Sequence, residues 1–145
     1  MFSHIAIALN NSMGAKKALE KAHQYISKAK PKKISLISVL PVGGNMSLGF
    51  TQEAGLGKEF FDTLSYQINQ NLKEAKKMFL NFGVEINTSL LAGNPGDEIV
   101  RYILENNVDL IFMGSRGRGR LKNHFLGSVS DRVAHHAPCH VYIVH

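Results

Sequence analysis

The sequence DLIFM (109–113), followed by GSRGRGRLKNHFLGS (114–128), is the most informative part of this chain. The first part is apolar after its aspartate, which is typical of a strand buried on both faces of a parallel sheet. The second part carries glycines and leads into a predicted helix. Glycine lets a backbone approach an anion closely, and a helix N-terminus offers N–H groups with partial positive charge. The stretch therefore predicts a strand, a phosphate-binding turn and a helix.

Strand and helix patterns alternate along the rest of the chain. Strands are expected at His4–Leu9, Ile34–Leu40, Val84–Leu91, Asp109–Met113 and Cys139–Val144. Apolar residues recur at helical spacing in the four intervals between them, whereas 42–57 has five glycines and no periodicity. The alternation predicts one α/β domain over 1–145, a doubly wound, open parallel five-stranded sheet of the Rossmann-like kind with helices on both faces. The aperiodic segment is a candidate lid.

Helix boundaries follow from local signals. The apolar positions from Phe61 to Phe82 predict one long helix that stops at Gly83. Asn94 and Pro95 form an N-cap and first-turn pair for the next helix. Ser128 and Asp131 fit the S-x-x-D capping box, so this serine could serve only to start the last helix.

Composition limits the classes of function. The 145 residues carry a formal net charge of +6 and a single cysteine, Cys139, which excludes an internal disulfide and a cysteine-based zinc site. No leader-like segment or membrane-length apolar run is present, so we expect a cytoplasmic protein with no membrane association. The positive charge favours anionic partners. Arg116, Arg118, Arg120 and Lys122 gather in the glycine-rich loop.

Topology predicts where a ligand would bind. In open parallel sheets ligands bind beyond the carboxyl ends of the strands, at the point where strand order reverses. The first and fourth strands both end in polar or glycine-rich turns and are the natural central pair. We therefore expect the site where 10–12 faces 114–128.

The spaced glycines and several other segments of the chain resemble those of a known protein family. Gly114, Gly117, Gly127 and Ser128 fit the pattern G-x2-G-x9-G-[ST]. Together with IFMGSRGRG, LGSVSDRVAHHAPCHVYIV, IAIALNNS and AGNPGDEIV, they resemble the universal stress protein family (UspA-like) in its ATP-binding branch. The resemblance covers nearly the whole chain and implies the strand order 3-2-1-4-5, ATP as ligand, and a stress-response regulatory function with no or weak hydrolysis.

The resemblance also implies roles for particular residues. Gly114 and Gly117 would line the ribose and phosphates, the start of the last helix would hold the phosphates, and Val39 and Met113 would border the adenine. Asn10 stands where the family usually has an aspartate. It can still bind ribose, but it lacks the charge that would help to hold Mg²⁺ or Mn²⁺ beside ATP. The full predicted nucleotide site is Ala8, Leu9, Asn10, Ser12, Val39, Met113, Gly114, Arg116, Gly117, Gly127, Ser128, Val129 and Ser130.

Other readings compete with this one. The arginine-rich loop 116–122 could instead bind RNA or another polyanion, although we expect no nucleic-acid partner, and a slow nucleotide hydrolase is a third reading. No catalytic residue is predicted, because the chain has neither a P-loop nor a recognisable catalytic base. No metal site is predicted from His135, His136 and His140, since adjacent histidines on a helix point apart.

The final predicted strand indicates that two copies of the chain pair with each other. The chain ends within it, so no following helix would cover its outer edge, and an open apolar edge strand tends to pair with another copy. In the resembling family the corresponding strand builds the dimer. We therefore expect a symmetric homodimer through 141–144.

Overall fold

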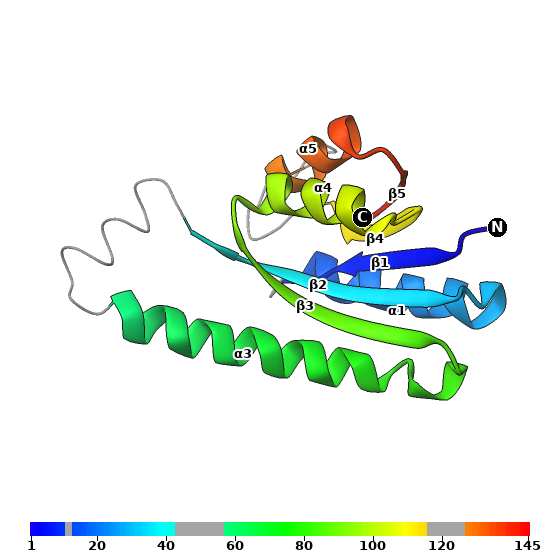
Figure 1. Cartoon of the computed structure of the whole chain (residues 1–145), viewed down its shortest axis with the longest axis horizontal. Coiled ribbons are helices and arrows are strands. Elements are labelled where there is room, and N and C mark those ends of the chain that lie inside the picture. Colours follow the sequence, from blue (N-terminus) through cyan, green and yellow to red (C-terminus); the bar gives the residue numbers. More distant parts are fainter. Residues whose placement is uncertain (11–12, 43–56, 116–126) are drawn as a thin grey trace.

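The computed structural model describes residues 1–10, 13–42, 57–115 and 127–145 (Figure 1). Its strands are β1 (His4–Ala8), β2 (Lys33–Pro41), β3 (Glu85–Gly93), β4 (Leu110–Gly114) and β5 (His140–Val144). Its helices are α1 (Met13–Ala29), α3 (Gly57–Lys77), α4 (Pro95–Asn106) and α5 (Ser128–His136), with the short 3-10 helix η1 (Leu80–Phe82). None of the helices in these ranges is long and apolar enough to cross a bilayer.

The strands form one parallel five-stranded sheet in the order β3-β2-β1-β4-β5. The central strand β1 pairs with both β2 and β4, with Ala8 beside Ile37 and Ile7 beside Phe112. The predicted fold class and strand order are therefore confirmed. Strand order reverses between β1 and β4, so the carboxyl ends of these two strands mark the place where parallel α/β sheets bind ligands.

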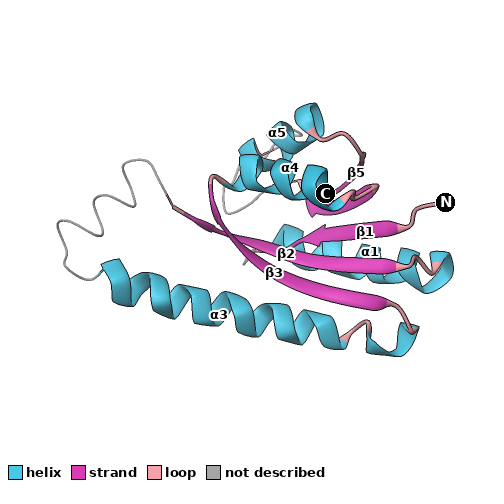
Figure 2. Cartoon of the chain, in the orientation of Figure 1, coloured by secondary structure: helices cyan, strands magenta, loops and turns pink. Residues whose placement is uncertain are grey.

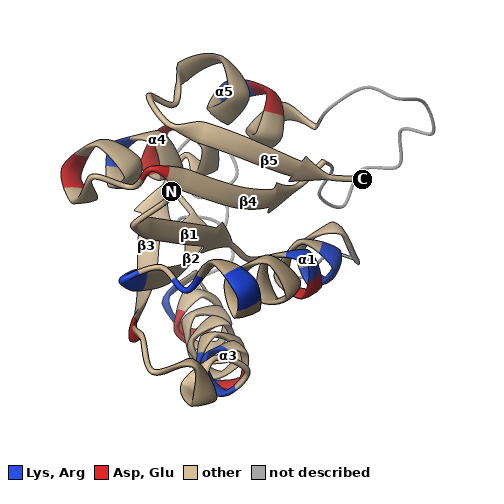
Figure 3. Ribbon diagram, turned by 90° about the vertical axis from the view of Figure 1, so that its right-hand side faces the viewer, with Lys and Arg blue, Asp and Glu red and all other residues tan. Residues whose placement is uncertain are grey.

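Helices cover both faces of the sheet (Figure 2). On one face α1 packs against β1, β4 and β5 while α3 packs against β2 and β3, and on the other face lie α4 and α5 (Figure 3). Alternation along the strands explains the two layers. Ile5 and Ile7 of β1 belong to the core beneath α1 and α3, and Ala6 between them belongs to the core beneath α4 and α5.

One predicted helix boundary is wrong. The expected helix through Phe82 ends as an α-helix at Lys77, and the chain continues through η1 to Gly83. The cause is aromatic packing. Residues three apart align on a 3-10 turn, and here the rings of Phe79 and Phe82 both lie against His23, with centroids 5.4 and 5.0 Å away. Gly83 has a φ of 70°, the left-handed conformation predicted from its position.

The amino edge of the sheet contains a buried polar network that periodicity does not reveal. His4 is 7% exposed, and its Nδ1 lies 2.9 Å from the carbonyl oxygen of Asn106 and its Nε2 2.7 Å from Ser35 Oγ. Because a carbonyl only accepts, Nδ1 carries the proton, and Nε2 accepts from Ser35. Tyr102 completes the network by donating its hydroxyl to Ser35 Oγ at 3.0 Å. Each group is satisfied when His4 is neutral.

Candidate functional site

The first wall of the candidate site is the end of β1. The backbone N–H of Leu9 donates to the carbonyl of Ile37 at 2.8 Å, and Ser38 Oγ donates to the carbonyl of Leu9 at 2.9 Å. Ser38 is 5% exposed, so this hydroxyl holds the turn from within the core. Asn10 follows immediately and is exposed at the carboxyl edge. The predicted ribose-binding residue therefore stands on a turn that is fixed from two sides.

The second wall is the end of β4, where Gly114 meets the first turn of α1. A Cβ on Gly114 would lie 2.6 Å from the carbonyl carbon of Gly14 and 2.8 Å from its oxygen, both backbone atoms. Real Cβ atoms do not come so close, so only glycine allows this contact. The prediction assigned Gly114 to close approach of a ligand. The structure gives it a further function, which is to let β4 and α1 touch beside the β1 turn.

The third wall is the start of α5, which is joined to the end of β4 through Ser115. The carbonyl oxygen of Ser115 accepts from the backbone N–H of Gly127 at 2.6 Å and from Ser130 Oγ at 2.7 Å. The N–H of Ser115 donates to the carbonyl of Val144 at 2.9 Å. The ends of β4 and β5 and the start of α5 therefore meet at this one residue, which is 5% exposed.

The N-cap of α5 differs from the one that the capping box predicts. Gly127 is the N-cap, Ser128 is the first helical residue, and no side-chain cap hydrogen bond is made there. The capping box, which was the competing interpretation of Ser128, is therefore not formed among the described residues, and the N-cap Gly127 is bonded to Ser115 instead. Ser128 is exposed, and the first intrahelical bond runs from the N–H of Asp131 to the carbonyl of Gly127. A cap without a side chain leaves the helix N-terminus accessible to an anion.

The predicted residues differ in what they offer a ligand. Val39 and Val129 are partly buried against the core beneath α4 and α5, and Met113 lies within that core with an exposure of 4%. Ser130 is 2% exposed and uses its hydroxyl on Ser115 and, at 3.2 Å, on the carbonyl of Gly127. These side chains support the edge from below, whereas Asn10 and Ser128 are exposed on it.

Some predicted residues lie outside the described residues. They are Ser12, Arg116 and Gly117, together with the other basic residues of the loop 116–122 and the candidate lid 43–56. Their roles stay predictions. The predicted residues that the structure describes come from β1, β2, β4 and α5, and all of them lie at the carboxyl edge of the sheet.

Several charged residues of α4 and α5 near this edge form ion pairs with one another. Arg132 of α5 forms an ion pair with Asp97 of α4, and Arg101 of α4 forms one with Glu98. Asp131, in the first turn of α5, lies 3.4 Å from His135 Nδ1. Among the described residues there is no group of three or more His, Cys, Asp or Glu side chains able to hold a metal.

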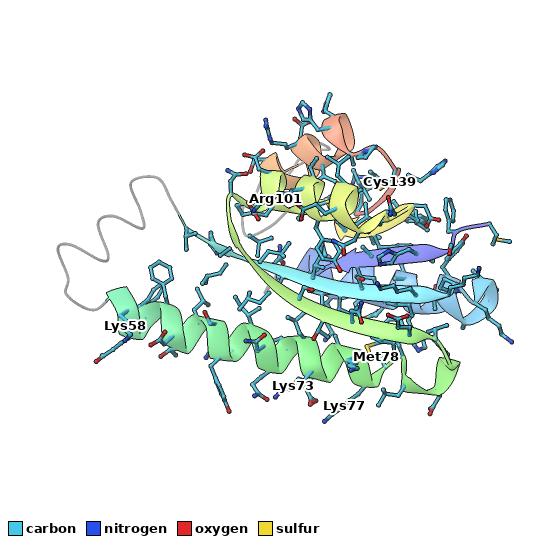
Figure 4. All side chains as sticks on the ribbon, in the orientation of Figure 1. Lys58, Lys73, Lys77, Met78, Arg101 and Cys139 are labelled. Atoms are coloured by element: carbon cyan, nitrogen blue, oxygen red, sulfur yellow. The ribbon has the colours of Figure 1, made fainter. Side chains whose placement is uncertain are left out.

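Cys139 and His140 lie away from this edge. Burial raises the pKa of the Cys139 thiol to about 11, so it is protonated at neutral pH. Its Sγ donates to the carbonyl of His140, and the ring of His140 packs edge-on against Phe2. Figure 4 shows Cys139 at the turn between α5 and β5. These contacts give both side chains a structural role.

Three supporting residues were missed by the sequence reasoning: Gly14, Ser38 and Ser115. Ser115 lay inside the quoted glycine-rich stretch, and Gly14 opens a predicted helix, so both were available as candidates. Neither carries a spacing signal that identifies a contact across the sheet. Ser38 is a polar residue in an apolar strand, and such a residue needs a hydrogen-bond partner when it is buried. That signal could have found it.

The fold places the chain among the open parallel α/β proteins, a class in which ligands bind at a strand-order reversal. The sequence matches the universal stress protein family over residues 1–145. The chain belongs to that family.

Individual relatives agree over most of the chain. A universal stress protein of Methanocaldococcus jannaschii, MJ0531, is 34% identical over 131 residues, which cover 90% of this chain and 76% of the relative. The universal stress protein YxiE of Bacillus subtilis is 32% identical over 148 residues, with 99% of each chain covered. Among solved structures, universal stress protein UspA from Lactobacillus plantarum superposes with a TM-score of 0.86 at 18% identity, covering 99% of this chain and 98% of that one.

Two further solved structures contain nucleotides. A universal stress protein in complex with cAMP matches with a TM-score of 0.69 at 21% identity, covering 99% of this chain and 97% of that one. A family protein from Arabidopsis thaliana with AMP bound matches with a TM-score of 0.56, also at 21% identity, over 98% of this chain and 90% of that one. Both are similar to this chain in fold.

Proposed function

We propose that the carboxyl edge of the sheet, between the ends of β1 and β4, binds ATP, and that the protein acts as a nucleotide-binding regulatory member of its family. The observation that carries the proposal is the open start of α5. Its N-cap Gly127 has no side chain and no side-chain cap, and Ser115 holds it at the end of β4. A rigid helix N-terminus without its own cap can donate backbone N–H groups to phosphate oxygens.

The neighbouring residues fit the other parts of a nucleotide. Asn10 is exposed on its fixed turn and has an amide that both donates and accepts, which suits ribose hydroxyl groups. The partly buried Val39 of β2 and the backbone of Met113 in β4 would border the base. The bound nucleotides in the cAMP and AMP structures of family members support adenine as the base.

The proposal includes slow or absent hydrolysis. ATP hydrolysis needs a residue that positions the attacking water and groups that hold a metal ion against the phosphates. Asn10 offers an amide where a carboxylate would attract Mg²⁺ or Mn²⁺. The protein would then signal through its nucleotide-bound state to partner proteins. Phosphate release by the purified protein, with each metal and without it, measures this part of the proposal.

The test of binding uses Gly127→Val. Gly127 has a φ of −70° and a ψ of 166°, values that any residue adopts, so a side chain there adds no backbone strain. We expect the variant to fold and to lose ATP affinity at least about tenfold, because the valine would cover the α5 N–H groups. Nucleotide released from the denatured wild-type protein is identified by chromatography, and ATP is then titrated into both proteins by calorimetry.

Asn94→Ala is the matched control, because it alters the N-terminus of α4 and should leave ATP affinity unchanged. Equal ATP affinity of the wild type and Gly127→Val would contradict the proposal. Binding that survives the substitution but falls steeply with salt would instead favour a polyanion-binding loop at 116–122.

We also propose a homodimer through β5. This strand lies at one end of the described sheet, and Val141 and Ile143 are only partly buried. Pairing of two copies along this edge would satisfy its free backbone groups. Sedimentation at micromolar concentration should give a dimer, and Ile143→Pro, which removes a backbone donor, should shift it toward monomer. A monomeric wild type would refute the dimer.

A further inference from the structure

A cleft separate from the nucleotide edge lies between the second half of α1 and the strands β4 and β5. It encloses about 220 Å³ and is lined by Lys21, Gln24, Tyr25, Lys28, Phe112 and Tyr142. The four α1 residues follow the spacing i, i+3, i+4 and i+7, so they lie on one face of the helix. Phe112 and Tyr142 are direct neighbours across β4 and β5. One side of the cleft is therefore helical and the other is the sheet surface.

The sheet side of this cleft presents an aromatic ring. Tyr142 stacks on Phe112 with centroids 4.9 Å apart and planes 23° apart, and Tyr25 meets Phe112 at 5.8 Å and 51°. Phe112 is fully buried, whereas Tyr142 is 43% exposed. In the single chain β5 is the last strand of the described sheet, and on this face α3 packs mainly against β2 and β3. A planar ring could stack on the exposed part of Tyr142.

The helical side of the cleft presents positive charge. Lys21 and Lys28 are both exposed, and neither forms an ion pair with any residue in the described part of the chain. Gln24 lies between them with an amide that can donate or accept. Two ammonium groups beside an aromatic surface suit a ligand that combines a flat ring with a negative charge. These ammonium groups would repel a cationic ligand, and a neutral ligand could form no ion pair with them.

We propose that this cleft is a binding site for a small planar aromatic carboxylate. The ring would stack on Tyr142, and the carboxylate would lie between the ammonium groups of Lys21 and Lys28. The volume selects for size, because drug-sized ligands occupy pockets of about 300 to 1,000 Å³. A cleft of about 220 Å³ therefore suits a molecule of one or two fused rings. The site does not depend on ATP binding, since the nucleotide edge lies at the opposite end of α1.

The test titrates 2-naphthoate into the full-length protein and follows binding by calorimetry and by NMR contacts to the Tyr142 ring. We expect saturable binding, at least tenfold weaker for the uncharged 2-naphthalenemethanol. Lys21→Gln with Lys28→Gln should weaken naphthoate binding about tenfold or more. The matched control is Lys73→Gln with Lys77→Gln, which removes the same charge from exposed positions on α3 (Figure 4) and should change affinity less than twofold.

Tyr142→Val keeps a strand-forming residue and should weaken binding up to about tenfold through lost stacking. The lysine pair tests the site even if this variant unfolds. No binding at millimolar naphthoate, or equal losses in the two lysine pairs, would overturn the proposal. Competition with ATP would place the ligand at the nucleotide edge and would also overturn it. Affinity that falls as protein concentration rises would show that the dimer proposed through β5 covers Tyr142, and would also overturn the proposal.

Discussion

At the amino edge of the sheet, side chains satisfy one another inside the protein, whereas at the carboxyl edge the contacts run mainly through backbone groups. His4, Ser35 and Tyr102 form a buried chain of hydrogen bonds that ends on a carbonyl of α4. At the other edge, Gly114 touches α1 through backbone atoms, and Gly127 donates its N–H to Ser115. The first arrangement leaves no group for a ligand, and the second exposes a helix N-terminus. The buried side-chain network and the edge on which we propose nucleotide binding thus lie at opposite ends of the strands.

Among the substitutions that test this comparison, Gly114→Ala is expected to lower the free energy of unfolding the most. Its Cβ would lie 2.6 Å from the backbone of Gly14, so β4 and α1 would have to separate. We expect overpacking of this kind to lower the free energy of unfolding by about 3 kcal/mol. Urea denaturation measures the change. The control is Gly83→Ala, where φ is 70° and nothing lies within 4 Å of the new Cβ, so only the left-handed conformation costs about 1 kcal/mol. Equal losses in the two variants would refute the close contact.

Two serine substitutions in β2 test the two edges of the sheet separately, and both are expected to lower the free energy of unfolding by less. Ser35 and Ser38 of β2 are both buried, at the amino and carboxyl edges respectively. Ser35→Ala would leave Tyr102 and His4 without their partner and should cost about 2 kcal/mol, with ATP affinity unchanged. Ser38→Ala removes the bond to Leu9 and should cost about 1 kcal/mol while weakening ATP binding severalfold, because the turn at Asn10 is released. Weaker ATP binding in Ser35→Ala alone would contradict the separation.

The two edges also differ in how far the sequence could predict them. Short apolar runs that alternate with segments of helical periodicity indicated the five strands and the layers, because burial on both faces makes a strand apolar throughout. The spaced glycines indicated the carboxyl edge for the same reason, since backbone contacts restrict residue type. The amino-edge network joins His4, Ser35 and Tyr102, which are far apart in the chain. Each is an ordinary residue in its own segment, so only the sheet register reveals that they meet.

The start of α5 is a second place where a contact between separate segments limits what the sequence can predict. The S-x-x-D pattern placed the cap on Ser128, because local rules describe a helix as if it were isolated. The bond from Gly127 to Ser115 is tertiary and moved the cap by one residue. At α4, where Asn94 Oδ1 accepts from the N–H of Asp97 at 3.1 Å, no tertiary bond competes and the predicted cap is correct.

A smaller effect is therefore expected from Asn94→Ala. Loss of this cap should cost about 1 kcal/mol of unfolding free energy. Gly127→Ala at the equivalent position of α5 should cost less, about 0.6 kcal/mol, because no side-chain cap is lost and only the preference for glycine over alanine at an N-cap is removed. Thermal unfolding of the two variants measures the difference. A larger loss in Gly127→Ala would mean that the start of α5 depends on its glycine for stability as well as for access.

The smallest effect is a pH dependence at the amino edge. Burial lowers the pKa of His4 most strongly, and Lys33 lowers it further, against raising effects from the bond to Asn106 and from Asp109 and Glu85. A lowered pKa in the folded protein means that, as pH falls below about 6.5, the unfolded chain takes up the proton first. Stability is therefore unaffected by this group above that pH and declines below it, until the folded histidine also protonates.

His4→Gln isolates this contribution, because glutamine keeps one donor and one acceptor but does not titrate. Between pH 7.5 and 5.5, urea denaturation should show a steeper loss of stability in the wild type than in the variant. The difference cannot exceed about 1.4 kcal/mol per pH unit for one proton. The exposed His136 provides the control, and His136→Gln should keep the wild-type slope. Identical slopes for wild type and His4→Gln would show that the network tolerates a charged His4, with the Ser35 hydroxyl turned to accept from it.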